Sequence, residues 1–179
     1  MRQWLKASAQ DSGQQTLLGG LTDLKSIMGG NDYETSPANY LATFREKLQA
    51  FRTSPSSTIA AQSAVTAAQD VANSLNNATK SVQAVRLGAD KEIATQVSTL
   101  NTLLAQFKTA NDAVKSETAT GGNPADALDE RDKLLKQISS IVGVNAVDRQ
   151  NGDMALYTTD GTVVFDTIPR TVTFVAQDT

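Results

Sequence analysis

The fold is decided by residues 57–89, STIAAQSAVTAAQDVANSLNNATKSVQAVRLGA. Apolar side chains recur here at alternating intervals of three and four residues: Ala61, Ala64, Ala68, Val71, Leu75, Ala78, Val82, Val85 and Ala89. This spacing places them on one side of an α-helix as a heptad seam, and alanine allows a second helix to approach closely. The stretch therefore predicts a helix that packs lengthwise against other helices.

The helical pattern continues from this seam toward Lys115. After Ala89 the intervals become four, four and three, which shifts the seam near Gly88 in the way that a stutter unwinds a supercoil. A helix from Ser57 to Lys115 would be about 90 Å long at about 1.5 Å per residue. Helices of this length are typical of assemblies and receptors.

Two shorter helices are predicted before the seam. Residues 17–28 carry a leucine stripe, and Gly29-Gly30 ends that helix because glycine tolerates the left-handed conformation. Ser36-Pro37 begins the next helix, whose face carries Tyr40, Phe44, Leu48 and Phe51. The pairs Gly19-Gly20 and Gly29-Gly30 lack the strand-turn-helix context of a phosphate cradle, so we interpret both as helix punctuation.

The pattern changes after Gly143. Asn123-Pro124 predicts the start of a helix that folds back antiparallel, and beyond it the apolar period becomes two. Asn151-Gly152 and Asp160-Gly161 predict turns, and Thr171 to Val175 predicts the last of about four strands. The predicted fold is mainly α, a rod-like antiparallel helical bundle with a small C-terminal antiparallel β segment, α+β overall. We expect a helical rod domain in 1–143 and the truncated start of a β-rich outer domain in 144–179.

Composition excludes several functions. The 179 residues include no cysteine and no histidine, which removes disulfides, thiolate zinc sites and imidazole bases. The net charge of -3 comes without a basic block, so no nucleic-acid partner is expected. No apolar run reaches the roughly 20 residues of a membrane span, and the N-terminus lacks a cleaved signal peptide. We predict no enzyme, no cofactor, no metal and no membrane insertion.

Two charged clusters are candidates for a metal site or an acid/base pair. Residues 129–133, DERDK, are explained by cationic neighbours three and four positions away on a helix surface rather than by a metal or acid/base pair. Asp148, Asn151 and Asp153 surround a glycine but do not have the ligand spacing of an EF-hand, so a hairpin turn is the preferred interpretation.

Residues 123–135, NPADALDERDKLL, continue through Ile138-Ser139 to Ile141-Val142-Gly143-Val144. They resemble the helix and first strand of the bacterial flagellar hook-associated protein 1 family, the hook-filament junction proteins. Residues 97–114, with Leu100-Asn101 and Leu103-Leu104, resemble the leucine-asparagine helix of that family. Residues 40–75 have the same order of parts, an aromatic helix, a proline-containing break and an alanine-rich helix.

The resemblance implies an internal fragment of an axial flagellar protein without the terminal polymerisation segments. Its role would be structural, in a ring that joins hook to filament, with the flagellar hook protein and the adjacent junction protein or filament as partners. Self-association would need the missing segments. The location would be the extracellular flagellum, reached by the flagellar secretion route.

Two rival functions remain open from the residues alone. A helical-bundle sensory or receptor module would bind a small molecule, and a secretion-related adaptor would be entirely helical. For every interpretation we expect no catalytic residue, and we expect structural or packing roles for Ala68, Leu75, Val82, Leu100, Leu104, Phe107, Leu128, Arg131, Leu135 and Ile138.

Overall fold

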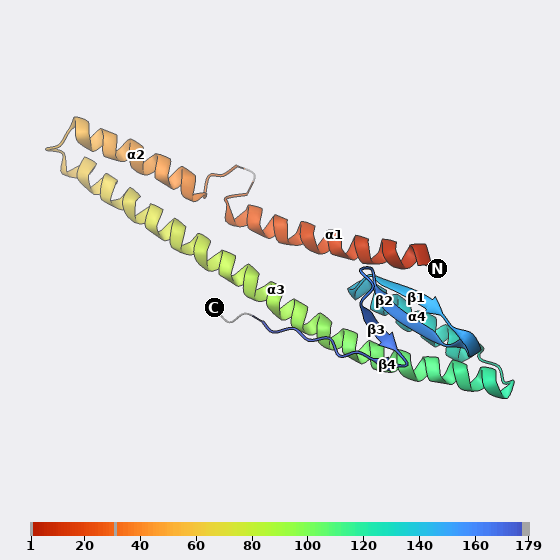
Figure 1. Cartoon of the computed structure of the whole chain (residues 1–179). Coiled ribbons are helices and arrows are strands. Elements are labelled where there is room, and N and C mark those ends of the chain that lie inside the picture. Colours follow the sequence, from red (N-terminus) through yellow and green to blue (C-terminus); the bar gives the residue numbers. More distant parts are fainter. Residues whose placement is uncertain (1, 31, 177–179) are drawn as a thin grey trace. The chain divides into compact units, whose positions relative to one another are not determined.

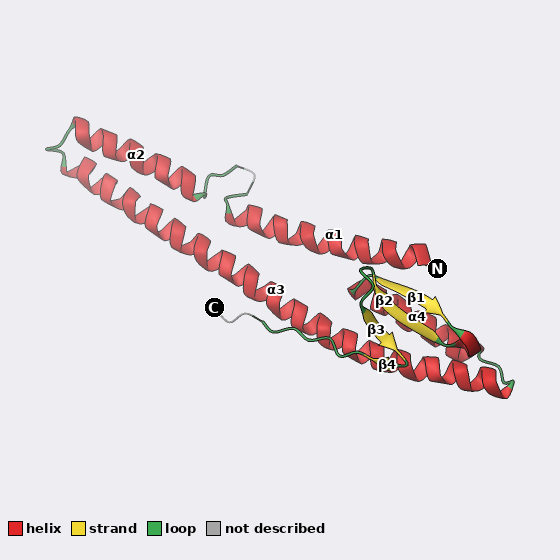
Figure 2. Cartoon of the chain, in the orientation of Figure 1, coloured by secondary structure: helices red, strands yellow, loops and turns green. Residues whose placement is uncertain are grey.

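The computed structural model describes residues 2–30 and 32–176, and the side chains from residue 7 onward. Four helices come first along the chain: α1 (Arg2–Ile27), α2 (Pro37–Thr53), α3 (Thr58–Thr120) and α4 (Ala125–Ile141). Four strands follow: β1 (Val144–Asp148), β2 (Met154–Thr158), β3 (Val163–Asp166) and β4 (Ile168–Pro169) (Figures 1 and 2). The predicted mainly α fold with a small C-terminal antiparallel sheet is confirmed.

The boundary between α1 and α2 follows the sequence signals. Gly29 has φ +100°, its N–H donates to Ser26 O, and the N–H of Gly30 donates to Lys25 O, which is the Schellman arrangement. The Ser36 hydroxyl then accepts from the N–H of Asn39 at 3.2 Å and caps α2. The pair Gly19-Gly20, by contrast, lies inside α1, so its interpretation as punctuation was wrong.

Helix α3 is continuous over 63 residues. It begins where the Ser57 hydroxyl accepts from the N–H of Ala60, passes through Gly88 without a break, and ends at Gly121, whose φ is +70°. A Cβ at Gly88 would meet nothing within 4 Å, so this glycine is not required by packing. The shift in apolar spacing near Gly88 therefore does not interrupt the helix.

The strands form one antiparallel sheet in the order β1-β2-β3-β4. Both predicted turns are present: Asn151 and Gly152 have φ of 57° and 72° between β1 and β2, and the N–H of Gly161 donates to Thr158 O between β2 and β3. The last predicted strand is misplaced. Strand β4 is Ile168–Pro169, and residues 171–175 lie outside the sheet.

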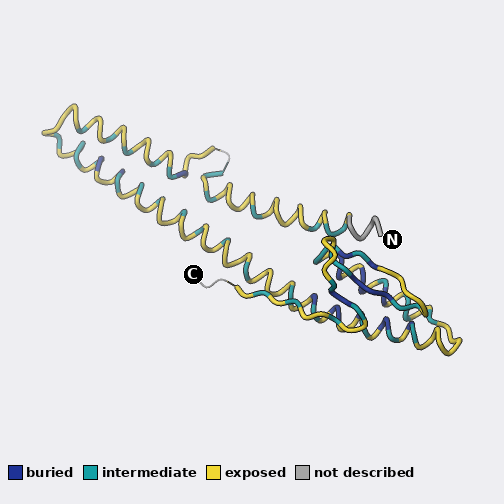
Figure 3. Tube along the Cα trace, viewed as in Figure 1, coloured by how far each residue is buried: buried dark blue, intermediate teal, exposed yellow. Residues whose placement is uncertain are grey.

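The chain divides into two compact units, one formed by residues 1–16 and 90–179 and the other by residues 17–89. In the first unit the sheet, α4 and the second half of α3 enclose the core, where Phe107 and Phe165 meet edge to face at 5.1 Å between ring centroids. Figure 3 shows burial concentrated here. The predicted boundary after residue 143 stays a prediction.

The unit of residues 17–89 buries much less. Its residues classed as buried are Ser36, Ala64 and Ala67, among those that the structure describes. Leu75 and Val82, expected in the seam, are 53% and 43% exposed instead. The inward positions are Ser74 and Ser81, one residue earlier, because at about 100° per residue two adjacent positions of a heptad border the same face. The apolar periodicity predicted Leu75 and Val82 for the inner face, whereas the structure places Ser74 and Ser81 there.

Candidate functional site

Arg131 is the one charged side chain classed as buried in the part of the chain that the structure describes, with 6% of its surface exposed. It shares one face of α4 with Leu134, Leu135 and Ile138, at positions three, four and seven residues along. The apolar stem of arginine packs on such a face while its head reaches a polar partner beyond it. The sequence thus places a cation inside an otherwise apolar stripe.

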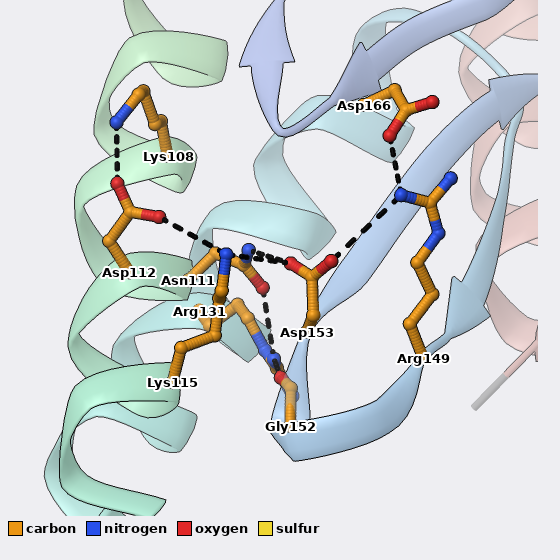
Figure 4. A network of polar contacts seen from close by, with 9 residues as sticks. All are labelled: Lys108, Asn111, Asp112, Lys115, Arg131, Arg149, Gly152, Asp153 and Asp166. Carbon is orange, nitrogen blue, oxygen red and sulfur yellow. Dashed lines mark hydrogen bonds and ion pairs between the residues drawn. The ribbon is translucent and has the colours of Figure 1, made fainter. Parts of the chain in front are cut away.

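The Arg131 guanidinium joins three elements that are distant in sequence (Figure 4). Its Nη1 donates to the carbonyl of Gly152 at 2.5 Å and to Oδ1 of Asn111 at 3.2 Å. Asn111, fully buried on α3, donates from Nδ2 to Oδ1 of Asp153 at 2.7 Å. We call Asn111, Arg131, Gly152 and Asp153 the polar staple, because they connect α3, α4 and the β1-β2 turn.

Burial and charge act on Arg131 in opposite directions. Burial lowers the pKa of the guanidinium, since removing a cation from water disfavours its charged form. The negative charges of Asp132, Asp148 and Asp153 raise that pKa in turn. The guanidinium of an arginine delocalises its charge and keeps its proton inside proteins. The staple therefore holds a buried positive charge opposite nearby carboxylates.

The staple continues outward through Asp153. Lys115 Nζ lies 3.7 Å from one carboxylate oxygen of Asp153, and Arg149 Nη1 lies 3.9 Å from the other. Arg149 also donates to Asp166 on β3 and to the Tyr157 hydroxyl on β2. The hydrogen bond to Asp166 raises the pKa of Arg149 and lowers the pKa of Asp166. These contacts tie the turn to the outer strands at the surface.

The staple holds structural elements in place and has no residues arranged for a reaction. Within the described residues no group of three or more His, Cys, Asp or Glu side chains could hold a metal ion. The charged cluster of residues 129–133 is divided by the fold: Glu130 and Lys133 pair at the surface at 3.2 Å, whereas Arg131 is buried. The staple can fix the sheet on the two helices, and it presents no activated nucleophile.

The predicted packing residues fall into three groups. Leu100, Leu104, Phe107, Arg131, Leu135 and Ile138 are buried in the first unit. Leu128 and Ala68 are partly buried. Leu75 and Val82 are exposed, as described above. The first group meets in a single region although its members come from two helices separated by a loop.

The sequence predicts no role for Asn111, and it assigns Asp153 to a hairpin turn and not to a buried contact. A signal for Asn111 was present, because it lies four residues after Phe107 and three before Val114, on the apolar face of α3. A polar residue at such a position needs a buried partner. Asp153 had no comparable signal, since an aspartate beside a turn is usually explained by the turn itself.

Fold and staple together define a helical structural module with a small sheet fixed on α3 and α4. None of the described helices has the length and apolar character needed to cross a membrane. The chain belongs to the family of the flagellar hook-associated protein FlgK helical domain, whose family model matches residues 21–179. This membership confirms the predicted family and the prediction of a structural module rather than an enzyme.

Curated relatives and a solved structure agree with this membership. The chain is 24% identical over 150 residues to flagellar hook-associated protein 1 of Bacillus subtilis, covering 84% of the chain and 29% of that relative. It is 24% identical over 157 residues to the Salmonella typhimurium protein of that name, covering 87% of the chain and 28% of that relative. The flagellar hook junction protein FlgK from Burkholderia pseudomallei superimposes with a TM-score of 0.75 at 22% identity, covering 93% of the chain and 29% of that protein. The chain thus spans less than a third of each.

Proposed function

We propose that this chain is the helical part of a subunit that joins the hook of a bacterial flagellum to its filament. The observation that carries the proposal is the family match over residues 21–179. The likeness to the Burkholderia protein, a flagellar hook junction protein, supports a position at the hook junction. The activity and the partners of the whole protein, as given below, are part of this proposal.

The exposed surface of residues 17–89 supports an assembly role. Large apolar side chains are exposed there on all three helices, including Leu17 at 63%, Leu41 at 56% and Leu75 at 53%. Exposed apolar side chains of this kind are available for contact with other protein chains. A module that works inside a larger assembly accounts for this exposure better than an isolated receptor domain does.

The staple supports a mechanical role. A buried arginine that bridges α3, α4 and the β1-β2 turn prevents these elements from sliding past one another, because each shift would leave a buried polar group unpaired. We propose a helical rod domain in 1–143 and the start of an outer domain in 144–179. Its proposed partners are the hook protein and the adjacent junction protein or filament, at the cell exterior after export by the flagellar route.

The test is complementation of a flagellated bacterium that lacks its own hook-filament junction protein. The full gene that encodes this chain is expressed, with the host's own junction gene and an empty vector as controls. Filaments restored on bare hooks in electron micrographs support the proposal. The proposal is refuted if the hooks stay bare and flagellin is lost to the medium although the protein is exported. The adaptor and receptor interpretations would then be preferred.

A matched pair of variants tests the exposed surface in the same strain. Leu21 is 54% exposed on α1, and Gln14 is an exposed polar residue on the same helix. We expect Leu21→Asp to reduce the number of filaments while the helical circular dichroism of the purified chain is unchanged. Gln14→Asp should leave both unchanged. Equal filament numbers in the two variants would show that this apolar surface does not serve assembly.

A further inference from the structure

The segment after β4 is extended but does not continue the sheet. The N–H of Arg170 donates to Val164 O at 2.9 Å, and from there residues 171–176 run beside α3 (Figure 1). Val172 and Phe174 are partly buried, whereas Val175 is 85% exposed. Val172 packs against the core. The segment thus has the alternation of a strand with one covered face.

The main chain of this segment is held by a side chain of α3. Asn101 donates from Nδ2 to the carbonyl of Val172 at 2.9 Å, and its Oδ1 accepts from the N–H of Val172 at 2.9 Å. The two residues are 71 positions apart. A carboxamide offers one donor and one acceptor side by side, as a peptide group does. Asn101 therefore supplies for one residue what a neighbouring strand supplies along a ladder.

We propose that Asn101 is a positioning residue that docks residues 170–176 on α3 as a strap and sets the path of the chain after the sheet. A helix cannot pair with an extended main chain through its own backbone, because its N–H and C=O groups are used within the helix. A side-chain amide is the group with which α3 can form both bonds. Aspartate would lose the donor and place a charge against the Val172 carbonyl.

Asn101 forms its hydrogen bonds with the main chain of residue 172 and not with its side chain. The strap therefore requires an N–H at this position, which proline would remove. It does not require valine for the two hydrogen bonds, although the partly buried valine side chain adds packing against the core. This role of Asn101 stands whether or not the chain joins hook to filament.

Hydrogen exchange of the Val172 amide in the full chain tests the strap. In Asn101→Ala we expect this amide to exchange about tenfold faster, the effect of losing its hydrogen-bond partner. The amides of Ala155 and Leu156 in β2, buried in the same unit, should keep their rates. Thr102→Ala is the matched control, because its exposed hydroxyl bonds only to Ser98 O in the described structure.

Trypsin gives a second readout, since Arg170 is exposed and is the first residue of the strap. Cleavage after Arg170 should become about tenfold faster in Asn101→Ala, in proportion to the opening of the strap, while cleavage after Arg149 keeps its rate. An unchanged Val172 amide and unchanged cleavage in Asn101→Ala would overturn the proposal. Equal acceleration at Val172, Ala155 and Leu156 would also overturn it, because Asn101 would then support the whole unit.

Discussion

Replacing Arg131 with methionine tests the staple most directly. Methionine keeps the length and apolar character of the arginine stem but has no donor, so the carbonyl of Gly152 and Oδ1 of Asn111 each lose the partner described above. Leaving a buried polar group without its hydrogen-bond partner costs about 1–3 kcal/mol for each group. Burial of the guanidinium is itself unfavourable, as the lowered pKa of Arg131 indicates. Removing the charge therefore recovers part of the lost free energy. We expect a loss of about 2–4 kcal/mol in the free energy of unfolding.

The assay must report on the unit that contains the staple. Urea unfolding followed at the NMR signal of the Leu156 amide meets this need, because Leu156 is fully buried in β2. Lys133→Met is the control on the same helix, since Lys133 is exposed and its pair with Glu130 lies at the surface. We expect a change below about 0.5 kcal/mol in the control.

A companion variant separates hydrogen bonding from packing. Asn111→Leu combined with Arg131→Met removes both polar partners, and the pair should cost less than the sum of the single changes, because fewer buried groups are left unpaired. A loss below about 1 kcal/mol for Arg131→Met, or equal losses for Arg131→Met and Lys133→Met, would refute the staple. Strict additivity in the double variant would show that Arg131 and Asn111 act independently.

Three further predictions concern the rest of the chain. Leu104→Ala should cost about 2–5 kcal/mol because the side chain is fully buried, whereas Leu75→Ala, at a position 53% exposed, should cost less than about 1 kcal/mol in the same urea titration. Gly88→Ala should stabilise α3 by about 0.5–1 kcal/mol, since a Cβ there meets nothing within 4 Å, and thermal unfolding followed by circular dichroism measures it. The hydrogen bond from Arg149 lowers the pKa of Asp166. The contribution of Asp166 to stability is therefore present above the unfolded-state pKa of about 4 and is lost as pH falls through the lower folded-state pKa. Asp166→Asn should make the acid unfolding curve less steep in this pH range, and an unchanged curve would contradict this.

Much of the local structure was predictable from the sequence. The cap at Ser36, the glycine ending at Gly29-Gly30 and the turn at Asn151-Gly152 each depend on the conformational preference of one or two residues, and such preferences act wherever the residue is placed. The apolar residues 100–107 of α3 form part of the core because their spacing matches a helix and their side chains are large. These features were determined by the chain itself.

The tertiary structure decided what depended on a distant partner. Leu75 and Val82 are each adjacent to a serine at the border of the same helix face. The packing of the neighbouring helices, and not the apolar spacing, places Ser74 and Ser81 on the inner side. Asp153 joined the staple because Asn111, 42 residues away, was brought to it. Residues 171–175 have strong strand propensity, yet a strand needs a neighbouring main chain, and the partner that the fold supplies at Val172 is the side chain of Asn101. Propensity is a property of nearby residues, whereas these contacts exist only once segments distant in sequence have met.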